Sequence, residues 1–147
     1  MSQEAFHTNK YKSIVQEYIR STINYLLESG IEFSLTAQTR YVSFDPQLPS
    51  SISNDFKDIV LFVMAGYTFE SSRLDGDAFV FEAGFGVDGF GSKVTIPLLS
   101  IKQIFVDDYP ILVNITEPIR EKAVQTEVNK SMEALLNNPK NKNLLKK

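Results

Sequence analysis

Three glycines within residues 84–89 come closer than any other motif in this chain to a known chemical signature. Gly84, Gly86 and Gly89 have the spacing of the fingerprint that binds the pyrophosphate of a dinucleotide. That fingerprint acts where a strand ends at the N-terminus of a helix, whose amides and dipole hold the phosphates. The residues that follow, 90–96, are typical of a strand instead. We therefore interpret the glycines as part of a hairpin and expect no cofactor.

The residues needed for hydrolytic or metal chemistry are scarce. The chain has one histidine, His7, and no cysteine, so catalytic triads and most zinc sites lack their components. The close carboxylate pairs are Asp75 with Asp77 and Asp107 with Asp108, and one pair cannot supply the six to eight oxygen ligands of calcium. Aspartates favour turns because they bond to the turn backbone. The sequence predicts a protein that is not an enzyme.

Aromatic side chains beside glycines suggest a different kind of site. Such clusters surround Gly66 and the Gly84-to-Gly86 segment, where a ligand backbone could approach closely. Their members are Met64, Tyr67, Phe69, Phe81, Phe85 and Phe90. Strand alternation places Glu82 on the face opposite Phe81, either in solvent or as a groove wall. These clusters suggest a peptide groove, and the alternative is that the aromatics are core.

A helix is predicted before these segments. Apolar residues from Tyr11 to Leu27 recur with helical spacing, and Gly30 follows where a C-terminal cap is expected. The apolar positions cover an arc of about 220°, which is wider than the stripe of about 100° that one core requires. Tyr11, Tyr18 and Tyr25 are spaced by seven and form a seam along one side. The seam suits a second helix, or else it covers the domain's own sheet.

Most of the remaining chain predicts strands. Residues 33–44 predict one strand, which can be bent. The apolar run 58–64 predicts a central strand covered on both faces. Residues 68–74 and 78–85 read as a hairpin, because Asp75-Gly76-Asp77 supplies a tight turn. Further strands are expected at 93–96, 104–106 and 109–115, with a short helix at 97–103. The sequence predicts an α+β fold that is mainly β.

Composition and charge indicate one domain and a tail. Residues 1–116 carry 8 basic and 14 acidic side chains, whereas residues 117–147 carry 7 basic and 4 acidic ones. An acidic body repels phosphate backbones, so nucleic acid is not expected as the main ligand. No apolar run is long enough to span a membrane, and the chain starts without a secretory signal. We expect a cytoplasmic protein with a domain at 1–116 and a flexible or partly helical linker and tail at 117–147.

The segment from Thr39 to Ile115 resembles the stringent starvation protein B (SspB) family, especially its alphaproteobacterial branch. The similar features, in order, are Tyr41-Val-Ser-Phe-Asp45, Asp58-Ile-Val-Leu61, Phe79-Val-Phe-Glu-Ala-Gly-Phe-Gly86 and Val94-Thr-Ile-Pro-Leu98, followed by Ile101 and Phe105. The resemblance implies a leading helix packed on a small, strongly bent Sm-like β-barrel, and a homodimer formed through that helix. Members of the family are adaptors of the ClpXP protease. They hold the ssrA degradation tag in a groove and tether it to the ClpX unfoldase.

The resemblance also implies positions for three sites. The peptide groove corresponds to Val63, Met64, Ala65, Tyr67, Glu82, Ala83, Gly84 and Phe85. The dimer interface corresponds to Tyr11, Ile14, Tyr18 and Tyr25. The ClpX-binding motif at the end of the tail corresponds to Leu144, Leu145, Lys146 and Lys147. The expected partners are therefore ssrA-tagged proteins, ClpX and a second copy of the chain, and the alternative is an Sm-like interaction module or structural subunit without a protease partner.

Overall fold

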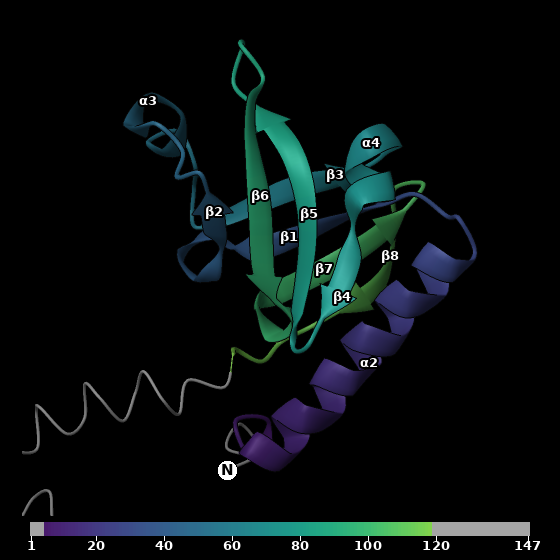
Figure 1. Ribbon diagram of the computed structural model, residues 1–147. Coiled ribbons are helices and arrows are strands. Elements are labelled where there is room, and N and C mark those ends of the chain that lie inside the picture. The colour runs from purple at the N-terminus through teal and green to yellow at the C-terminus, as the bar shows by residue number, and fades with distance from the viewer. Residues whose placement is uncertain (1–4, 119–147) are drawn as a thin grey trace, which may run out of the picture.

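The fold consists of one long helix and two antiparallel sheets of four strands each (Figure 1). The computed structural model describes residues 5–118. The first sheet has the strand order β3-β1-β7-β8 and the second has the order β2-β6-β5-β4. The prediction of an α+β fold made mainly of strands is confirmed. Of the predicted tail at 117–147, only Glu117 and Pro118 are among the described residues.

Helix α2 spans Asn9–Glu28 and has a defined cap at each end. The hydroxyl of Thr8 accepts a hydrogen bond from the Tyr11 N–H at 3.1 Å. At the other end, Gly30 has a φ of 68°, and the Ile31 N–H donates to the Leu26 carbonyl at 2.9 Å. These two features form a Schellman motif, as the position of the glycine predicted. The buried face of α2 packs on the second sheet and the turn before β7, and it consists of Ile19, Ile23 and Leu26.

The first sheet contains β3 (Ile59–Met64), β1 (Phe33–Gln38), β7 (Ile101–Val106) and β8 (Tyr109–Val113). Strand β3 pairs with β1 and lies at the edge of the sheet, so its predicted central position is wrong. The prediction failed because both faces of β3 are apolar although only one is buried. Phe62 and Met64 point into the core, whereas Leu61 and Val63 are more than half exposed on the other face.

The second sheet contains β2 (Ser43–Asp45), β6 (Phe90–Pro97), β5 (Ala78–Phe85) and β4 (Arg73–Asp75). The segment predicted as one strand at 33–44 is divided between the sheets, because a 3-10 turn at Thr39–Tyr41 redirects the chain from β1 to β2. Strands β5 and β6 form the predicted hairpin through a turn at residues 86–89. The inward side chains of both sheets form one core, in which Phe33, Phe62, Phe79 and Phe81 are in ring contact.

Three short segments complete the fold. Residues Ser50–Ser53 form the one-turn helix α3 between β2 and β3. Residues Gly66–Ser71 form helix α4. The strand predicted at 68–74 is therefore replaced by this helix and the short strand β4 at Arg73–Asp75. The helix predicted at 97–103 is a 3-10 turn at Leu98–Ser100, after which β7 begins.

The aspartate pairs occupy turns, as predicted. Asp107 and Asp108 both have positive φ angles, 52° and 70°, in the turn between β7 and β8. Asp75 and Asp77 flank Gly76 in the turn between β4 and β5, and Asp77 accepts a hydrogen bond from Arg20 of α2 at 2.8 Å.

Candidate functional site

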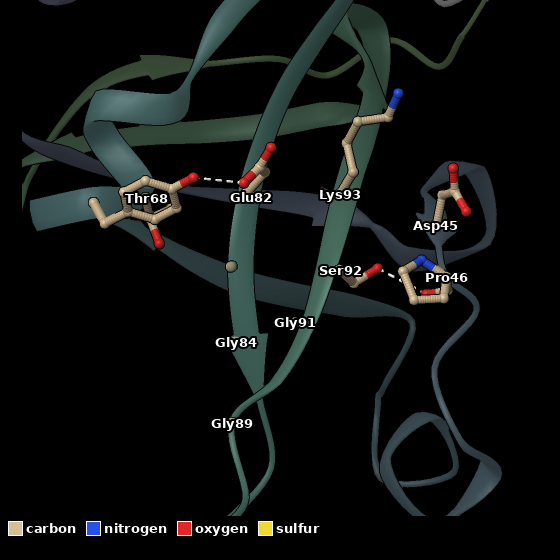
Figure 2. Close-up of a pocket in the computed structure, with 11 residues that line it drawn as sticks. Asp45, Pro46, Thr68, Glu82, Gly84, Gly89, Gly91, Ser92 and Lys93 are labelled. Carbon is tan, nitrogen blue, oxygen red and sulfur yellow. Dashed lines mark hydrogen bonds between the residues drawn. The ribbon is translucent and has the colours of Figure 1, made fainter.

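A groove of about 570 Å³ crosses the outer face of the second sheet (Figure 2). Its floor is formed by β5 and β6, one wall by α4 and the other wall by the end of β2. The residues that line it are Asp45, Pro46, Tyr67, Thr68, Glu82, Ala83, Gly84, Gly89, Gly91, Ser92 and Lys93.

Glycines leave the floor of the groove bare. Gly84 on β5 is directly opposite Gly91 on β6, so neither strand projects a side chain outward at this position. The next outward-facing pair along the hairpin is Glu82 with Lys93. The backbone of both strands is therefore accessible to a ligand over the glycine pair, with a carboxylate and an ammonium group at one end.

Helix α4 is held in place as the first wall by polar bonds. The Gly66 N–H donates to the Glu32 carboxylate at 2.8 Å and fixes the start of the helix. The Tyr67 hydroxyl donates to Glu82 Oε1 at 2.6 Å, and the Glu82 N–H donates to Ser71 Oγ at 2.9 Å. Both ends of the short helix are thus anchored, one of them to the strand that forms the floor.

The second wall is attached to the floor in a similar way. Ser92 Oγ donates to the Pro46 carbonyl at 2.9 Å (Figure 2). Asp45 of β2 is opposite Lys93 of β6 in the strand register. The width of the groove is therefore set by two hydrogen-bonded walls on one hairpin, which makes the groove largely pre-formed.

One strand edge beside the groove has no strand partner among residues 5–118. Strand β4 pairs with β5 only from Ala78 to Val80. At Glu82 the edge of β5 is occupied by Ser71 of α4, and beyond it, from Ala83 to Phe85, β5 pairs on its β6 side alone. A free strand edge presents backbone donors and acceptors to an added strand.

The groove combines charges of both signs with a polarised tyrosine. Asp45 and Glu82 supply carboxylates and Lys93 supplies an ammonium group. The hydrogen bond to Glu82 raises the pKa of Tyr67, and the negative charge of Glu82 adds to this effect. Tyr67 therefore stays a neutral hydrogen-bond donor into alkaline solution. The arrangement offers a ligand hydrogen-bond donors and acceptors together with charges of both signs.

The structure brings together half of the residues expected to form the peptide groove. Tyr67, Glu82, Ala83 and Gly84 line it. The other four predicted residues are Val63, Met64, Ala65 and Phe85. Met64 is fully buried in the core, and Val63 is exposed on the outer face of the first sheet. Ala65 is exposed at the N-cap of α4, outside the groove lining.

Phe85 has a packing role below the groove. Its ring contacts Phe44, Phe56 and Phe62 with centroid separations of 5.6 to 6.4 Å. It also lines a second hollow of about 500 Å³ between α3 and the tip of the β5–β6 hairpin. This cluster supports β2 and the end of β5 from the interior.

Sequence reasoning missed the part of the groove that comes from β2 and β6. These residues are Asp45, Pro46, Gly89, Gly91, Ser92 and Lys93, together with Thr68 of α4. The hairpin prediction contained a usable signal, because pairing β5 with β6 around the turn places Gly91 opposite Gly84. The contribution of β2 depends on the path of the chain between the two sheets and has no comparable signal.

The glycines of the dinucleotide-like motif lie in this hairpin. Gly84 is in β5, Gly86 and Gly89 are in the turn with φ angles of 78° and 65°, and the next element is strand β6. The interpretation of the motif as hairpin glycines is confirmed.

The residues expected at a dimer interface share one side of α2. Ile14, Tyr18 and Tyr25 are each more than half exposed. Tyr11 is half-buried, with its ring 5.3 Å from the ring of Phe6. The residues expected to bind ClpX, Leu144, Leu145, Lys146 and Lys147, lie outside the described residues.

Within residues 5–118 no helix combines the length and hydrophobicity needed to cross a bilayer. No protein-family model matches the chain, and a comparison with curated proteins finds no match to it.

Proposed function

We propose that this protein is an adaptor that binds ssrA-type degradation tags and tethers tagged proteins to the ClpX unfoldase for ClpXP proteolysis. The observation that carries the proposal is the glycine floor of the groove beside the unpaired edge of β5. The resemblance to the SspB family supplies the identity of the peptide and of the unfoldase. In the same proposal, the two antiparallel sheets correspond to the Sm-like fold of that family.

An extended peptide is the ligand that best fits this groove. Main-chain groups of a peptide can bond to the free edge of β5 from Ala83 to Phe85, as in other cases of strand addition. The absence of side chains at Gly84 and Gly91 lets the peptide backbone lie close to the sheet. Side chains of the peptide would then contact Tyr67 on one wall and Asp45 on the other. Such contacts give moderate affinity and limited sequence selectivity.

The proposal includes a homodimer through α2. Ile14, Tyr18 and Tyr25 form an exposed apolar seam that the domain's own core does not use. Two copies of the seam can pack against each other with two-fold symmetry. The dimer would present two grooves and two tails, and the second contact with ClpX would then be intramolecular, which raises avidity.

Titration of a fluorescein-labelled ssrA tag peptide tests the groove. Gly91→Leu places a large side chain on the floor, and a Cβ at Gly91 meets no atom within 4 Å, so the fold should tolerate it. The matched control is Ser34→Leu on the first sheet, outside the groove lining. We expect Gly91→Leu to lose peptide binding and Ser34→Leu to keep it. Equal affinities for the two variants would remove the groove from the proposal.

An interaction module without a protease partner is the rival function. A degradation assay with ClpXP and an ssrA-tagged fluorescent protein separates the two. The adaptor should lower the substrate concentration needed for half-maximal degradation. Peptide binding without any stimulation would favour the rival.

A further inference from the structure

The outer face of the first sheet carries exposed apolar side chains that the tag-binding proposal does not use. It is formed by Ser34, Thr36, Gln38, Ile59, Leu61, Val63, Gln103, Phe105 and Val113, which the strand register places on one side. The hydrogen bond from Thr36 Oγ1 to Gln103 Oε1 at 3.3 Å crosses this face. The large aliphatic members of the set are 45–60 % exposed. No part of residues 5–118 therefore covers them.

The composition of this outer face defines what can cover it. Its aliphatic side chains lie on the edge strands, at Leu61 and Val63 of β3 and at Val113 of β8. Phe105 lies on the inner strand β7, and polar side chains occupy β1. None of its nine residues is charged. A contiguous apolar patch of this kind usually marks an interaction site. The covering element should be apolar, uncharged on the buried side, and tolerant of a polar centre.

The described chain ends at a corner of this same face. Glu117 forms an ion pair with Arg40 at 3.4 Å, and Arg40 follows two residues after Gln38. Gln38 is paired with Ile59, the first residue of β3. Residues 119–123 can reach about 17 Å when extended, which is enough to bring residue 124 onto the sheet.

The sequence beyond Pro118 contains a segment with the required pattern. Val124, Val128, Met132, Leu135 and Leu136 follow one another at intervals of four, four, three and one residues. At 100° per residue they occupy an arc of about 120°, and the polar residue within this arc, Gln125, is uncharged. As a helix, residues 124–136 would be about 20 Å long, which equals the length of a six-residue strand.

We propose that residues 124–136 form an amphipathic helix that covers the outer face of the first sheet in the same molecule. A short connection gives this segment a high effective concentration at the face, which favours it over a second copy of the chain. The proposal is independent of tag binding. It would leave the residues after Pro139 as the part of the tail that extends from the domain.

Paramagnetic relaxation in the full-length chain tests this placement. The natural chain has no cysteine, so one nitroxide can be attached at Asp58→Cys, immediately before β3 and beside the face. We expect loss of the amide signals of residues 124–136. A nitroxide at Val87→Cys, at the exposed tip of the β5–β6 hairpin of the other sheet, should leave these signals intact.

Paired substitutions in residues 124–136 provide the second part of the experiment. Val128→Glu with Met132→Glu puts charges on the apolar side and should restore the signals that the Asp58→Cys label removes. Thr126→Glu with Lys130→Glu has the same spacing on the opposite side and should leave the signal loss unchanged. Neither pair lies within residues 5–118, and unchanged amide spectra of the sheets would confirm that the fold is retained.

Three results would overturn the proposal. The first is equal broadening of the amide signals of residues 124–136, or no broadening, with the labels at positions 58 and 87. The second is that both substitution pairs change the signal loss caused by the label at position 58 to the same extent. The third is signal loss in a mixture of nitroxide-labelled chains with separate isotope-labelled chains, because the face would then be covered by another copy.

Discussion

The phenolic oxygen of Tyr67 lies 2.6 Å from Oε1 of Glu82 and joins the α4 wall of the groove to its β5 floor. Both side chains are exposed, so the bond contributes little to global stability. Its effect is local, since it holds the tyrosine ring at the edge of the groove and directs the Glu82 carboxylate toward α4. This pair can therefore be changed to examine binding without a large change in folding.

Replacing Glu82 should change the titration of Tyr67. The hydrogen bond to Glu82 raises the pKa of Tyr67 above the ordinary tyrosine value of about 10. Because the native state favours the protonated hydroxyl, the stabilisation is complete below the ordinary pKa and is lost as the pH rises through the native pKa. Glu82→Gln should lower the Tyr67 pKa, measured from the ring ¹³C shift between pH 8 and pH 12 (roughly the tyrosine range). Tyr109→Phe, a change at an exposed residue elsewhere, should leave that titration unaltered.

Alanine substitutions at the two floor glycines should differ in stability. A Cβ at Gly84 would lie 3.3 Å from the Gly89 carbonyl oxygen, so the turn must shift to accept it. A Cβ at Gly91 meets nothing, and alanine there restricts the unfolded chain. We expect Gly91→Ala to be neutral or stabilising by up to about 1 kcal/mol, and Gly84→Ala to be destabilising by about 1 kcal/mol. Urea denaturation measures both, and the reverse order would contradict the close approach of Gly84 to the turn.

Asn114 should be among the polar residues most sensitive to substitution. Its side-chain amide donates to the carbonyls of Leu99 and Ile101, both at 2.9 Å. Its oxygen accepts from the N–H and the hydroxyl of Thr116 at 2.8 and 2.7 Å, and both residues are buried. Asn114→Ala should lower the free energy of unfolding by at least about 2 kcal/mol, because buried groups lose their partners. Asn24→Ala, at an exposed helix position, should stay within about 0.5 kcal/mol of the natural chain.

Tyr18→Glu should separate the proposed dimer into monomers. Tyr18 lies in the middle of the α2 seam and is 53 % exposed, so the charge should not disturb the core. Light scattering at micromolar concentration gives the mass of each form. Asn24→Glu, which adds the same charge to α2 outside the seam, should remain dimeric. A natural chain that is already monomeric would rule out the interface.

Deleting residues 144–147 should abolish the stimulation of ClpXP degradation. The proposal assigns these residues to the contact with ClpX and assigns tag binding to the groove. Peptide affinity should therefore be the same with and without them. Full stimulation by the truncated protein would show that Leu144 and Leu145 are not the docking motif.

The helix and most of the strands could be predicted because their signals are local. The period of α2, the cap at Gly30 and the turns at Gly76 and Asp107 each depend on a few adjacent residues. The position of β3 could not be predicted in this way. Its apolar run is typical of a strand buried on both faces. Because the outer face of the first sheet also carries apolar side chains, the edge strand β3 has the same sequence pattern as a buried strand.

Helix α4 and half of the groove depend on contacts distant in sequence. Tyr67, Thr68 and Phe69 favour a strand by composition, but the bonds from Gly66 to Glu32 and from Tyr67 to Glu82 stabilise a helix there. The approach of Asp45 to Lys93 likewise depends on the turn that moves the chain between the sheets. Such contacts are properties of the assembled fold.

The position of Asn114 has a mechanical consequence. Strand β8 is an edge strand that pairs with β7 alone among residues 5–118, and a strand in this position can be peeled away one rung at a time. A pulling force on the tail enters the domain through Glu117 and Thr116 and reaches Asn114 before it reaches the first rung of β8. The buried bonds of Asn114 must then break together, which distributes the load over the carbonyls of Leu99 and Ile101. We therefore expect the domain to resist a pull on its tail better than an edge strand without these bonds would.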